Sequence, residues 1–569
     1  MKNLPWIRSL LLTVVCACGL VVIPLSVAAD DPGPRLKGLS LEDMRRLGER
    51  MYRNGILPSG DPMQAIVKGD VPVDGTMFAC SSCHYRSGFG ASEGRVRTPP
   101  IDGTRLYAPL SKFKGIPLKN RTGGLKSEDI YRPAYTDESL ARVIRTGEDP
   151  TGRQIYDVMP IYLLSDRDTE ILVTYLKNLS SGLQPGVTDT NLRFATVITE
   201  EVTKEDREAM LGPLRTFIDH WRISRTMERM TRRDAYLQEG TSTGLKKLSL
   251  AVWELKGPAE TWRQQLEEYY QKEPAFALLG GITTGEWAPI HRFCEDHEIP
   301  AVFPVTNFPV ISDTDWYTLY LSKGFYQEGE TTAKYLHSKD DLPKDMSVIQ
   351  VFRNDQAGLV LSKSFQETWL SLGGTAPENV ALDRSDQITE TFWKKLASKR
   401  KHVVVLLWLN ATDFTAFESL AKVQNRPAMV FVSSALLGKH LYSMPETVRP
   451  LVYITYPYTL PQESQRYKLS IDASLKKNDI PVTNPEIAYK MYSLFSTLTG
   501  PFAMMRNYIY RDYFLELIES SPDTSTTPAI YPRLSFGAGQ RYASKGCYIV
   551  QLTDGPHPEL VKRSEWVIH

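Results

Sequence analysis

Hydrophobic residues recur at helical spacing in two segments of the first third of the chain. Ser40 can cap the first segment and Ser165 the second. The apolar faces of the two segments comprise Met44, Leu47, Met51, Ile171, Leu172, Leu176 and Leu179. We expect the two helices to cross, because Gly48 on the first would let the Tyr175 ring of the second approach closely.

From residue 192 onward, short apolar runs of buried-strand length alternate with segments of helical periodicity. The predicted strands are residues 194–199, 248–253, 276–279, 301–305, 346–352, 403–407 and 429–432. The predicted helices include residues 326–337, 358–372, 411–422 and 502–518, and one that begins at Pro485 after an Asn484 cap. This alternation is typical of parallel sheets covered by helices. A break near residues 342–343 divides it into two lobes, and short antiparallel strands are expected from residue 534.

The two patterns meet at residues 181–191, whose glycine, proline and serine content is typical of a linker. We therefore expect a mostly helical domain over residues 38–180 and an α/β unit over residues 192–569. The 569 residues are enough for about three structural units. The 67 basic and 66 acidic residues nearly cancel, which gives no support for nucleic acid or an anionic membrane surface as a partner.

Residues 1–29 predict a secretory signal peptide. Lys2 and Arg8 accompany an apolar run over residues 9–25, and small residues favour cleavage after residue 28 or 29. Two alternatives stay open: an uncleaved membrane anchor, since the run is just long enough to span a bilayer, and lipidation at Cys18. We expect a periplasmic protein with no membrane segment beyond the signal.

The chemistry of the first domain centres on a Cys-x-x-Cys-His motif. The thiols of Cys80 and Cys83 can each add across a haem vinyl group, and His84 then places an imidazole beneath the iron. A zinc site would need two further ligands at similar spacing, and a thioredoxin-like pair would not need an adjacent histidine. The motif therefore predicts one covalently attached haem c, which agrees with export because this attachment takes place outside the cytoplasm.

The sixth ligand of the iron is expected to be Met159. It precedes Pro160 and lies shortly before the helix predicted from residue 166 onward. A thioether ligand raises the haem potential and favours electron transfer over oxygen chemistry. The alternative is that Met159 belongs only to the core. Met63 and Met77 are weaker candidates, because both precede the motif.

The motif, the Met-Pro pair and the helix after it resemble the corresponding parts of class I cytochromes c. The resemblance covers roughly a quarter of the chain. It implies an all-α haem domain in which His84 and Met159 are the axial ligands. The interval between these two residues is long for a small cytochrome. Residues 98–132, within that interval, are expected to form surface loops near the haem edge.

The α/β unit resembles type I periplasmic binding proteins of the leucine/isoleucine/valine-binding kind. The resemblance is carried, in order, by residues 278–284, 299–306 and 326–335. It implies a two-lobed fold with a small-molecule ligand between the lobes. Thr283, Thr284 and Thr306 match strand-end positions that take the ligand's carboxylate, although ordinary turn chemistry also explains these threonines.

An amino-acid ligand is not expected. The family's amino-acid binders often carry an aromatic residue where this chain has Asp-Gln-Ala-Gly at residues 355–358. They also use an acidic residue where it has Ser-Ser-Ala at residues 433–435, and a buried ammonium without a carboxylate would be costly. Trp408 and Asn410 lie at another strand end and could line a cleft, although a tryptophan is more often part of the core.

The α/β unit has no sequence motif for catalysis, neither a nucleophile elbow nor a phosphate loop. His291 and His297 are expected to be ordinary helix-surface histidines, and residues 222–233 a solvated helix face. Cys294 and Cys547 are the cysteines outside the signal and the motif. They can form a disulfide in an oxidising compartment, or remain buried thiols.

The sequence therefore predicts an exported monohaem protein that transfers electrons with a redox partner protein, and not an enzyme. The α/β unit would dock that partner or bind a small ligand. A second hypothesis is a solute-binding protein whose haem is structural or regulatory. A third is an enzyme whose lobes hold an organic substrate that reduces the haem. It ranks last, because a haem with both axial positions filled offers no open site.

Overall fold

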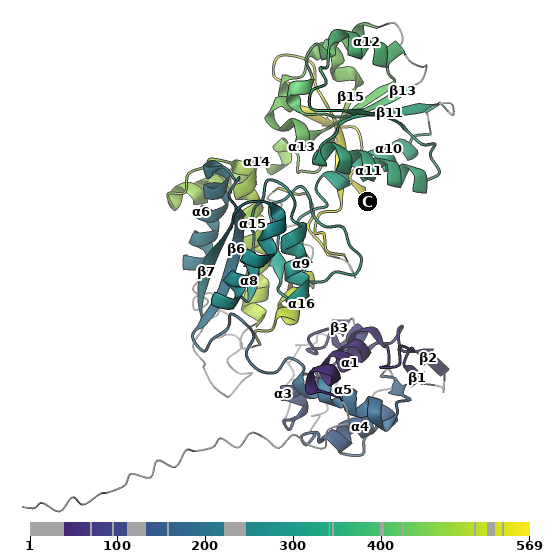
Figure 1. Cartoon of the computed structure of the whole chain (residues 1–569), viewed down its shortest axis with the longest axis vertical. Coiled ribbons are helices and arrows are strands. Elements are labelled where there is room, and N and C mark those ends of the chain that lie inside the picture. Colours follow the sequence, from purple (N-terminus) through teal and green to yellow (C-terminus); the bar gives the residue numbers. More distant parts are fainter. Residues whose placement is uncertain are drawn as a thin grey trace, which may run out of the picture.

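The computed structural model describes residues 39–568, apart from residues 69–70, 94–95, 111–131, 156–158, 221–245, 341, 344–345, 399–402, 424–425, 506–507, 521–529 and 537–539. The predicted signal peptide and the arginine-rich residues 222–233 thus lie outside the described residues, as do most of the loops expected over residues 98–132. Figure 1 shows an N-terminal domain followed by two α/β lobes.

The N-terminal domain is built around two long helices, α1 (Leu41–Asn54) and α5 (Asp166–Asn178). Both caps are confirmed, since the side chains of Ser40 and Ser165 accept hydrogen bonds from the backbone N–H groups of Asp43 and Asp168. The shorter helices are α2 (Cys80–His84), α3 (Gly103–Leu106) and α4 (Asp137–Thr146).

The expectation of an all-α domain is wrong in one respect. Three short strands form an antiparallel sheet in the order β2-β1-β5, and β3 (Ser92–Glu93) pairs with β4 (Val96–Arg97). The strands of the sheet are β1 (Gln64–Val67), β2 (Val71–Asp74) and β5 (Ile161–Tyr162). The sheet joins β1, ahead of the Cys-x-x-Cys-His motif, to β5, which follows Met159, a long-range pairing that hydrophobic periodicity does not reveal.

Helices α1 and α5 cross at Gly48, as the sequence predicts. A methyl group on Gly48 would lie 2.5 Å from Cβ of Tyr175 and 2.9 Å from the carbonyl oxygen of Ile171. Tyr52, one turn further along α1, packs its ring 5.4 Å from that of Tyr175. The close approach of the two helices therefore depends on the absence of a side chain at position 48.

Gly48→Ala is expected to destabilise the N-terminal domain by about 2 kcal/mol, because Tyr175 or the backbone of α5 must move to admit the methyl group. Gly500→Ala is the matched control: Gly500 is an exposed helical glycine with nothing within 4 Å of a Cβ atom. The control is expected to be neutral or stabilising. Calorimetric melting of both variants checks the prediction, and an unchanged transition in Gly48→Ala would contradict it.

The first lobe contains a five-stranded parallel sheet in the order β10-β9-β8-β6-β7. Its strands are β6 (Asn191–Thr199), β7 (Lys247–Leu255), β8 (Ala277–Leu279), β9 (Ala301–Val302) and β10 (Thr318–Leu319). Its first helices are α6 (Lys204–His220), α8 (Trp262–Lys272) and α9 (Ala288–Asp296). The predicted strands are thus confirmed, with β9 shorter than expected.

The second lobe contains a sheet in the order β12-β11-β13-β14-β15-β16-β17, in which β18 also pairs with β16. The pairings from β12 to β15 are parallel, and those of β16 with β15, β17 and β18 are antiparallel. The strands are β11 (Ser347–Arg353), β12 (Glu378–Leu382), β13 (Val403–Trp408), β14 (Met429–Ser433), β15 (Val452–Tyr456), β16 (Gly546–Leu552), β17 (Leu560–Lys562) and β18 (Val567–Ile568). The helices are α10 (Phe325–His337), α11 (Gln356–Ser371), α12 (Glu390–Ser398) and α13 (Ser434–Leu437).

The chain passes between the lobes more than once. After β15 it returns to the first lobe as α14 (Pro461–Lys477), α15 (Pro485–Met505) and α16 (Arg511–Glu519), and β16 then re-enters the second. Leu494 of α15 and Phe514 of α16 share a core with Phe194 of β6. Among the described helices, none has the length and apolar character that a bilayer crossing demands.

Two predicted helices are wrong. Residues 411–422 form two short 3-10 segments, Ala411–Asp413 and Phe417–Lys422, because Ala416 between them has a left-handed φ of 57°. The helix predicted over residues 502–518 is divided, since α15 ends at Met505 and α16 begins at Arg511. The new helix lets the Arg511 guanidinium donate to the carbonyl groups of Ala275 and Phe276 at 2.7 and 2.9 Å.

Candidate functional site

The Cys-x-x-Cys-His motif forms the short helix α2, and α1 holds it in place. The Ser81 hydroxyl donates to the carbonyl oxygen of Arg53 at 3.0 Å. The Tyr52 hydroxyl donates to the carbonyl oxygen of Tyr85, the residue that ends α2, at 2.7 Å. Cys80, Cys83 and His84 therefore lie together on one short helix, which two hydrogen bonds connect to α1.

His84 is buried, and its ring is oriented by the backbone. Its Nδ1 atom lies 3.0 Å from the carbonyl oxygen of Pro99, so Nε2 is the nitrogen that can bind an iron. Burial lowers the pKa of His84 to about 4, while the Pro99 carbonyl opposes this shift. A neutral imidazole with one nitrogen fixed by a carbonyl group is the form in which histidine binds metals.

The two thiols of the motif have different surroundings. Cys83 is exposed, whereas the thiol of Cys80 is enclosed by the domain core. Burial raises the pKa of the Cys80 thiol to about 12, and a hydrogen bond with Tyr162 acts in the opposite direction. Neither cysteine is paired in a disulfide. The absence of a disulfide at these two positions is what covalent attachment to a porphyrin requires.

Met159 is half-buried and lies shortly before β5. Strand β5 in turn contacts the residues that precede the motif. Tyr162 of β5 donates its hydroxyl to the carbonyl oxygen of Phe78, two residues before Cys80, at 2.6 Å. Of the weaker candidates, Met63 is fully buried in the domain core, and Met77 is 73% exposed. The two cysteines of α2 and the oriented His84 ring fit a covalently bound haem, and Met159 as the sixth ligand stays a prediction.

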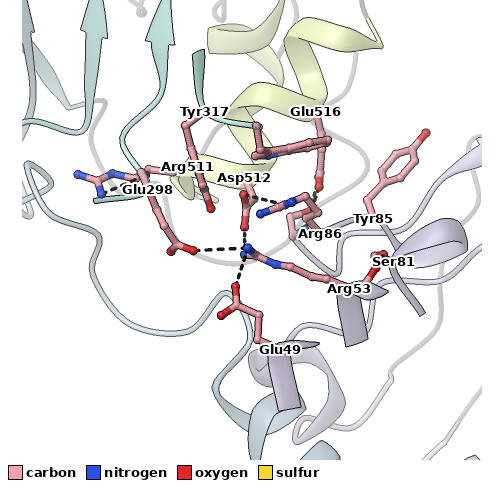
Figure 2. Close-up of polar contacts among 12 residues, drawn as sticks. Glu49, Arg53, Ser81, Tyr85, Arg86, Glu298, Tyr317, Arg511, Asp512 and Glu516 are labelled. Atoms are coloured by element: carbon pink, nitrogen blue, oxygen red, sulfur yellow. Dashed lines mark hydrogen bonds and ion pairs between the residues drawn. The ribbon is translucent and has the colours of Figure 1, made fainter. Parts of the chain in front are cut away.

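The N-terminal domain contacts the first lobe through an ion cluster next to the motif. Arg53, at the end of α1, lies 2.6 Å from Glu49, 2.9 Å from Asp512 and 3.4 Å from Glu298. Asp512 belongs to α16 and Glu298 follows α9, so one arginine joins the two parts (Figure 2). The Arg53 side chain is mostly buried, and separating the parts would leave the carboxylates of Asp512 and Glu298 without this partner.

A second contact joins the segment after α2 to α16. The backbone N–H of Ser87 donates to Oε1 of Glu516 at 2.9 Å, and the Ser87 hydroxyl bonds Oε2. Both side chains are buried. Burial raises the pKa of the Glu516 carboxyl to about 8, the charge of Asp512 raises it further, and the bonds with Ser87 lower it.

Aromatic and cationic side chains complete this contact. Phe89 stacks on Tyr513 of α16, with ring centroids 4.4 Å apart. The Arg105 guanidinium lies 4.5 Å from the Phe89 ring centroid, and that of Arg86 lies 4.5 Å from the Trp316 ring. We call the ion cluster around Arg53, the Ser87–Glu516 contact and these ring contacts the docking interface. Sequence analysis missed it, because its partners come from distant parts of the chain.

The three candidate threonines are engaged in turns or exposed. The Thr283 hydroxyl donates to the carbonyl oxygen of Gly285 at 3.0 Å, and Thr306 accepts from the N–H of Phe308. Thr284 is exposed. A cavity of about 10 Å³ beside Thr306 has room for little more than one water molecule. The turn chemistry considered from the sequence is therefore present, and a role in ligand binding stays a prediction.

Glu328 of α10 is a buried carboxyl that sequence analysis missed. It accepts a hydrogen bond from the hydroxyl of Thr455 on β15, and it bonds Ser433 at the end of β14. Burial raises its pKa to about 7, and these hydrogen bonds lower it. An acidic side chain therefore does lie at the strand end where the sequence shows Ser-Ser-Ala, because α10 supplies it.

Of four other residues considered from the sequence, His291 differs most from its expected surroundings. His291 is not a surface residue: it is buried, with its ring nitrogens 2.9 Å from the Tyr320 hydroxyl and 2.8 Å from Asp315. His297 is half-buried against Glu267. Trp408 belongs to the core, and Asn410 is exposed.

Cys294 and Cys547 are buried free thiols. They lie in the cores of different lobes, on α9 and β16, so the disulfide alternative is not formed. In the part of the chain that the structure describes, no group of three His, Cys, Asp or Glu side chains is arranged to hold a metal ion. The Cys-x-x-Cys-His motif is therefore the candidate metal site, and its metal would be the iron of a bound haem.

No family model matches this chain, and no curated protein matches it. Among solved structures, it is similar to an ABC transporter substrate-binding protein from Sphaerobacter thermophilus, at 12% identity, over 66% of this chain and 99% of that one, with a TM-score of 0.47. It is also similar to a branched-chain amino acid ABC transporter protein from Thermus thermophilus with bound valine, at 11% identity, over 67% and 97%, with a TM-score of 0.45. At such values the likeness identifies no ligand, and the two-lobed α/β fold rests on the strand order and parallel pairings above.

Proposed function

We propose that this chain is an exported c-type cytochrome joined to a two-lobed binding unit, and that its single covalent haem serves electron transfer. The observation that carries the proposal is His84: a buried imidazole with Nδ1 held by the Pro99 carbonyl, directly after two cysteines that are spaced three apart and form no disulfide. When bound, the haem supplies reversible one-electron chemistry.

The residues of the chain have separate roles in this proposal. Cys80 and Cys83 form the thioether bonds, and His84 and Met159 bind the two axial positions. The Pro99 carbonyl fixes the plane of the imidazole. Because α1 and the segment that follows α2 contact α16, a redox partner would meet either the remaining surface of the N-terminal domain or the first lobe beside it.

Met159→Ala is expected to abolish the weak near-infrared-edge absorption band that sulfur ligation gives ferric haem. Loss of the thioether also opens the sixth position, so the ferrous protein is expected to bind carbon monoxide readily. Met77→Ala is the matched control, since Met77 is 73% exposed and lies near the motif in sequence. If the unmodified protein lacks this band, or Met77→Ala loses it, the Met159 assignment fails.

A second candidate is a solute-binding protein whose haem has a regulatory role. It is favoured by the position of α16, which contacts the haem-attachment segment at Ser87 and also belongs to the core of the first lobe. Reduction of the haem would then change solute affinity, and by linkage the solute would shift the haem potential by the matching free energy. Equal solute affinity in the ferric and ferrous proteins would contradict this coupling.

A further inference from the structure

A cavity of about 750 Å³ lies at the docking interface, which is within the range of small-molecule sites. Its walls come from α1, from Ser81 and Ser82 of α2, and from α16 and the adjoining part of the first lobe. It is not the haem pocket, since Cys80, Cys83, His84 and Met159 do not line it. It is also separate from the threonines of the predicted ligand site between the lobes.

One face of α1 lines the cavity with arginine. Arg46, Arg50 and Arg53 are spaced four and three residues apart, so their side chains lie on the same face of the helix. Arg86 adds a fourth guanidinium from the segment after α2. Figure 2 shows Arg53 and Arg86 extending toward α16 from the N-terminal domain.

Several of these guanidinium groups have buried donors that are not used. The Nε atoms of Arg50, Arg53 and Arg86 are buried, and none has a hydrogen-bond partner among the described residues. The Nε atom of Arg86 lies 3.6 Å from Oδ1 of Asp512, too far for a hydrogen bond. Because buried donors are normally satisfied, these point to an acceptor that occupies the cavity.

The carboxylates that line the cavity are already engaged. Glu49 pairs with Arg53, Glu519 pairs with Arg541, and Glu516 bonds Ser87. Arg50 instead donates to the carbonyl oxygen of Leu57, so its charge has no carboxylate partner among the ion pairs of the described residues. The partner of Arg46 is Asp43, at 3.7 Å on the exposed surface. Arg46 and Arg50 of α1 therefore carry positive charge that the carboxylates lining the cavity do not neutralise.

Three aromatic side chains, those of Tyr85, Trp316 and Phe536, also line the cavity. The guanidinium groups of Arg86 and Arg541 already lie 4.5 and 3.8 Å from the Trp316 ring centroid, so a ligand ring would meet Tyr85 and Phe536. We propose that the cavity binds a small aromatic carboxylate, with the carboxylate on Arg50 and Arg46 and the ring beside the aromatic side chains of Tyr85 and Phe536. This site lies outside the proposed electron-transfer function and places a ligand directly behind the haem-attachment helix.

The test is a calorimetric titration of the full haem-loaded chain with phenylacetate. Binding is expected, and Arg50→Met is expected to weaken it about tenfold or more, because a charge-assisted hydrogen bond is lost. Arg46→Met, which removes an exposed side chain, is expected to weaken it in the same direction. Arg45→Met is the matched control, since Arg45 on the same helix pairs with Glu42 and does not line the cavity.

Three results would overturn the proposal: no heat with phenylacetate, equal affinity in Arg50→Met and Arg46→Met and the unmodified chain, or inorganic phosphate binding as tightly as phenylacetate. The last result would indicate a simple anion site without use of the aromatic wall. The haem absorption spectrum is recorded for every variant. It reports on the proposed function separately, because none of the substituted arginines belongs to the haem-binding residues.

Discussion

The double substitution Cys80→Ala with Cys83→Ala is expected to leave the protein without covalently bound haem. The two thioether bonds are the attachment that survives denaturation, whereas bonds from His84 and Met159 to iron do not survive it. Haem staining of a denaturing gel, with a haemochrome spectrum of the unfolded chain, measures the loss directly. We expect no haem to remain on the chain under these conditions.

The control for this experiment is Cys294→Ala. Cys294 is also a free thiol, but it lies in the core of the first lobe and outside the motif. We expect this variant to retain haem in full, with only the stability loss that a small core truncation causes. Haem that stays bound to the double variant after denaturation would contradict attachment through the motif, and haem lost from Cys294→Ala would show that general misfolding explains the result.

Local signals in the sequence predicted the scaffold of the N-terminal domain well. The caps at Ser40 and Ser165 are read from residues within three positions of each helix start. The crossing at Gly48 also follows from one glycine and one aromatic residue at helical spacing. By contrast, the sheet that pairs β1 with β5 joins segments about a hundred residues apart, and short strands leave little periodicity to detect.

In the lobes, apolar runs predicted the buried strands because a parallel sheet covered on both faces needs continuous hydrophobic sequence. The errors have tertiary causes. Residues 411–413 form a 3-10 segment and not an α-helix, and Asp413 in this segment pairs with Arg353 of β11 at 2.5 Å. His291 is buried because Asp315 and Tyr320 satisfy its ring, and neither partner is recognisable as such in the sequence.

The candidate site also has one part that the sequence predicts and another that only the fold reveals. The residues proposed to bind haem are adjacent or carry a local Met-Pro signal, so the sequence alone is enough to propose them. The docking interface depends on Ser87 and Glu516, which are 429 positions apart. No spacing rule connects two such residues, and the charge of a glutamate predicts solvent exposure and not burial. The contact between Glu516 and the segment that follows α2 became evident only from the fold.

Glu516→Gln is expected to remove much of the pH dependence of the contact between the N-terminal domain and the first lobe. The pKa of Glu516 rises from about 4.5 to about 8 on folding, so the folded chain keeps a proton that the unfolded chain releases between these values. The stabilisation from this group is therefore complete below about pH 4.5 and is lost as pH rises toward 8. At roughly 1.4 kcal/mol for each pKa unit, the loss reaches roughly 3–5 kcal/mol at most.

A glutamine amide reproduces the protonated acid, since it can accept from the Ser87 N–H and donate to the Ser87 hydroxyl. Calorimetric melting between about pH 5 and about pH 9 should therefore show the unmodified chain losing stability relative to Glu516→Gln as pH rises. Glu268→Gln, at an exposed position on α8, is the control and should follow the unmodified chain. Parallel melting curves for the unmodified chain and Glu516→Gln would show that Glu516 is ionised in the docked state. The interface would then be held by charge, through Arg53 and Arg86, and not by a neutral hydrogen-bonded acid.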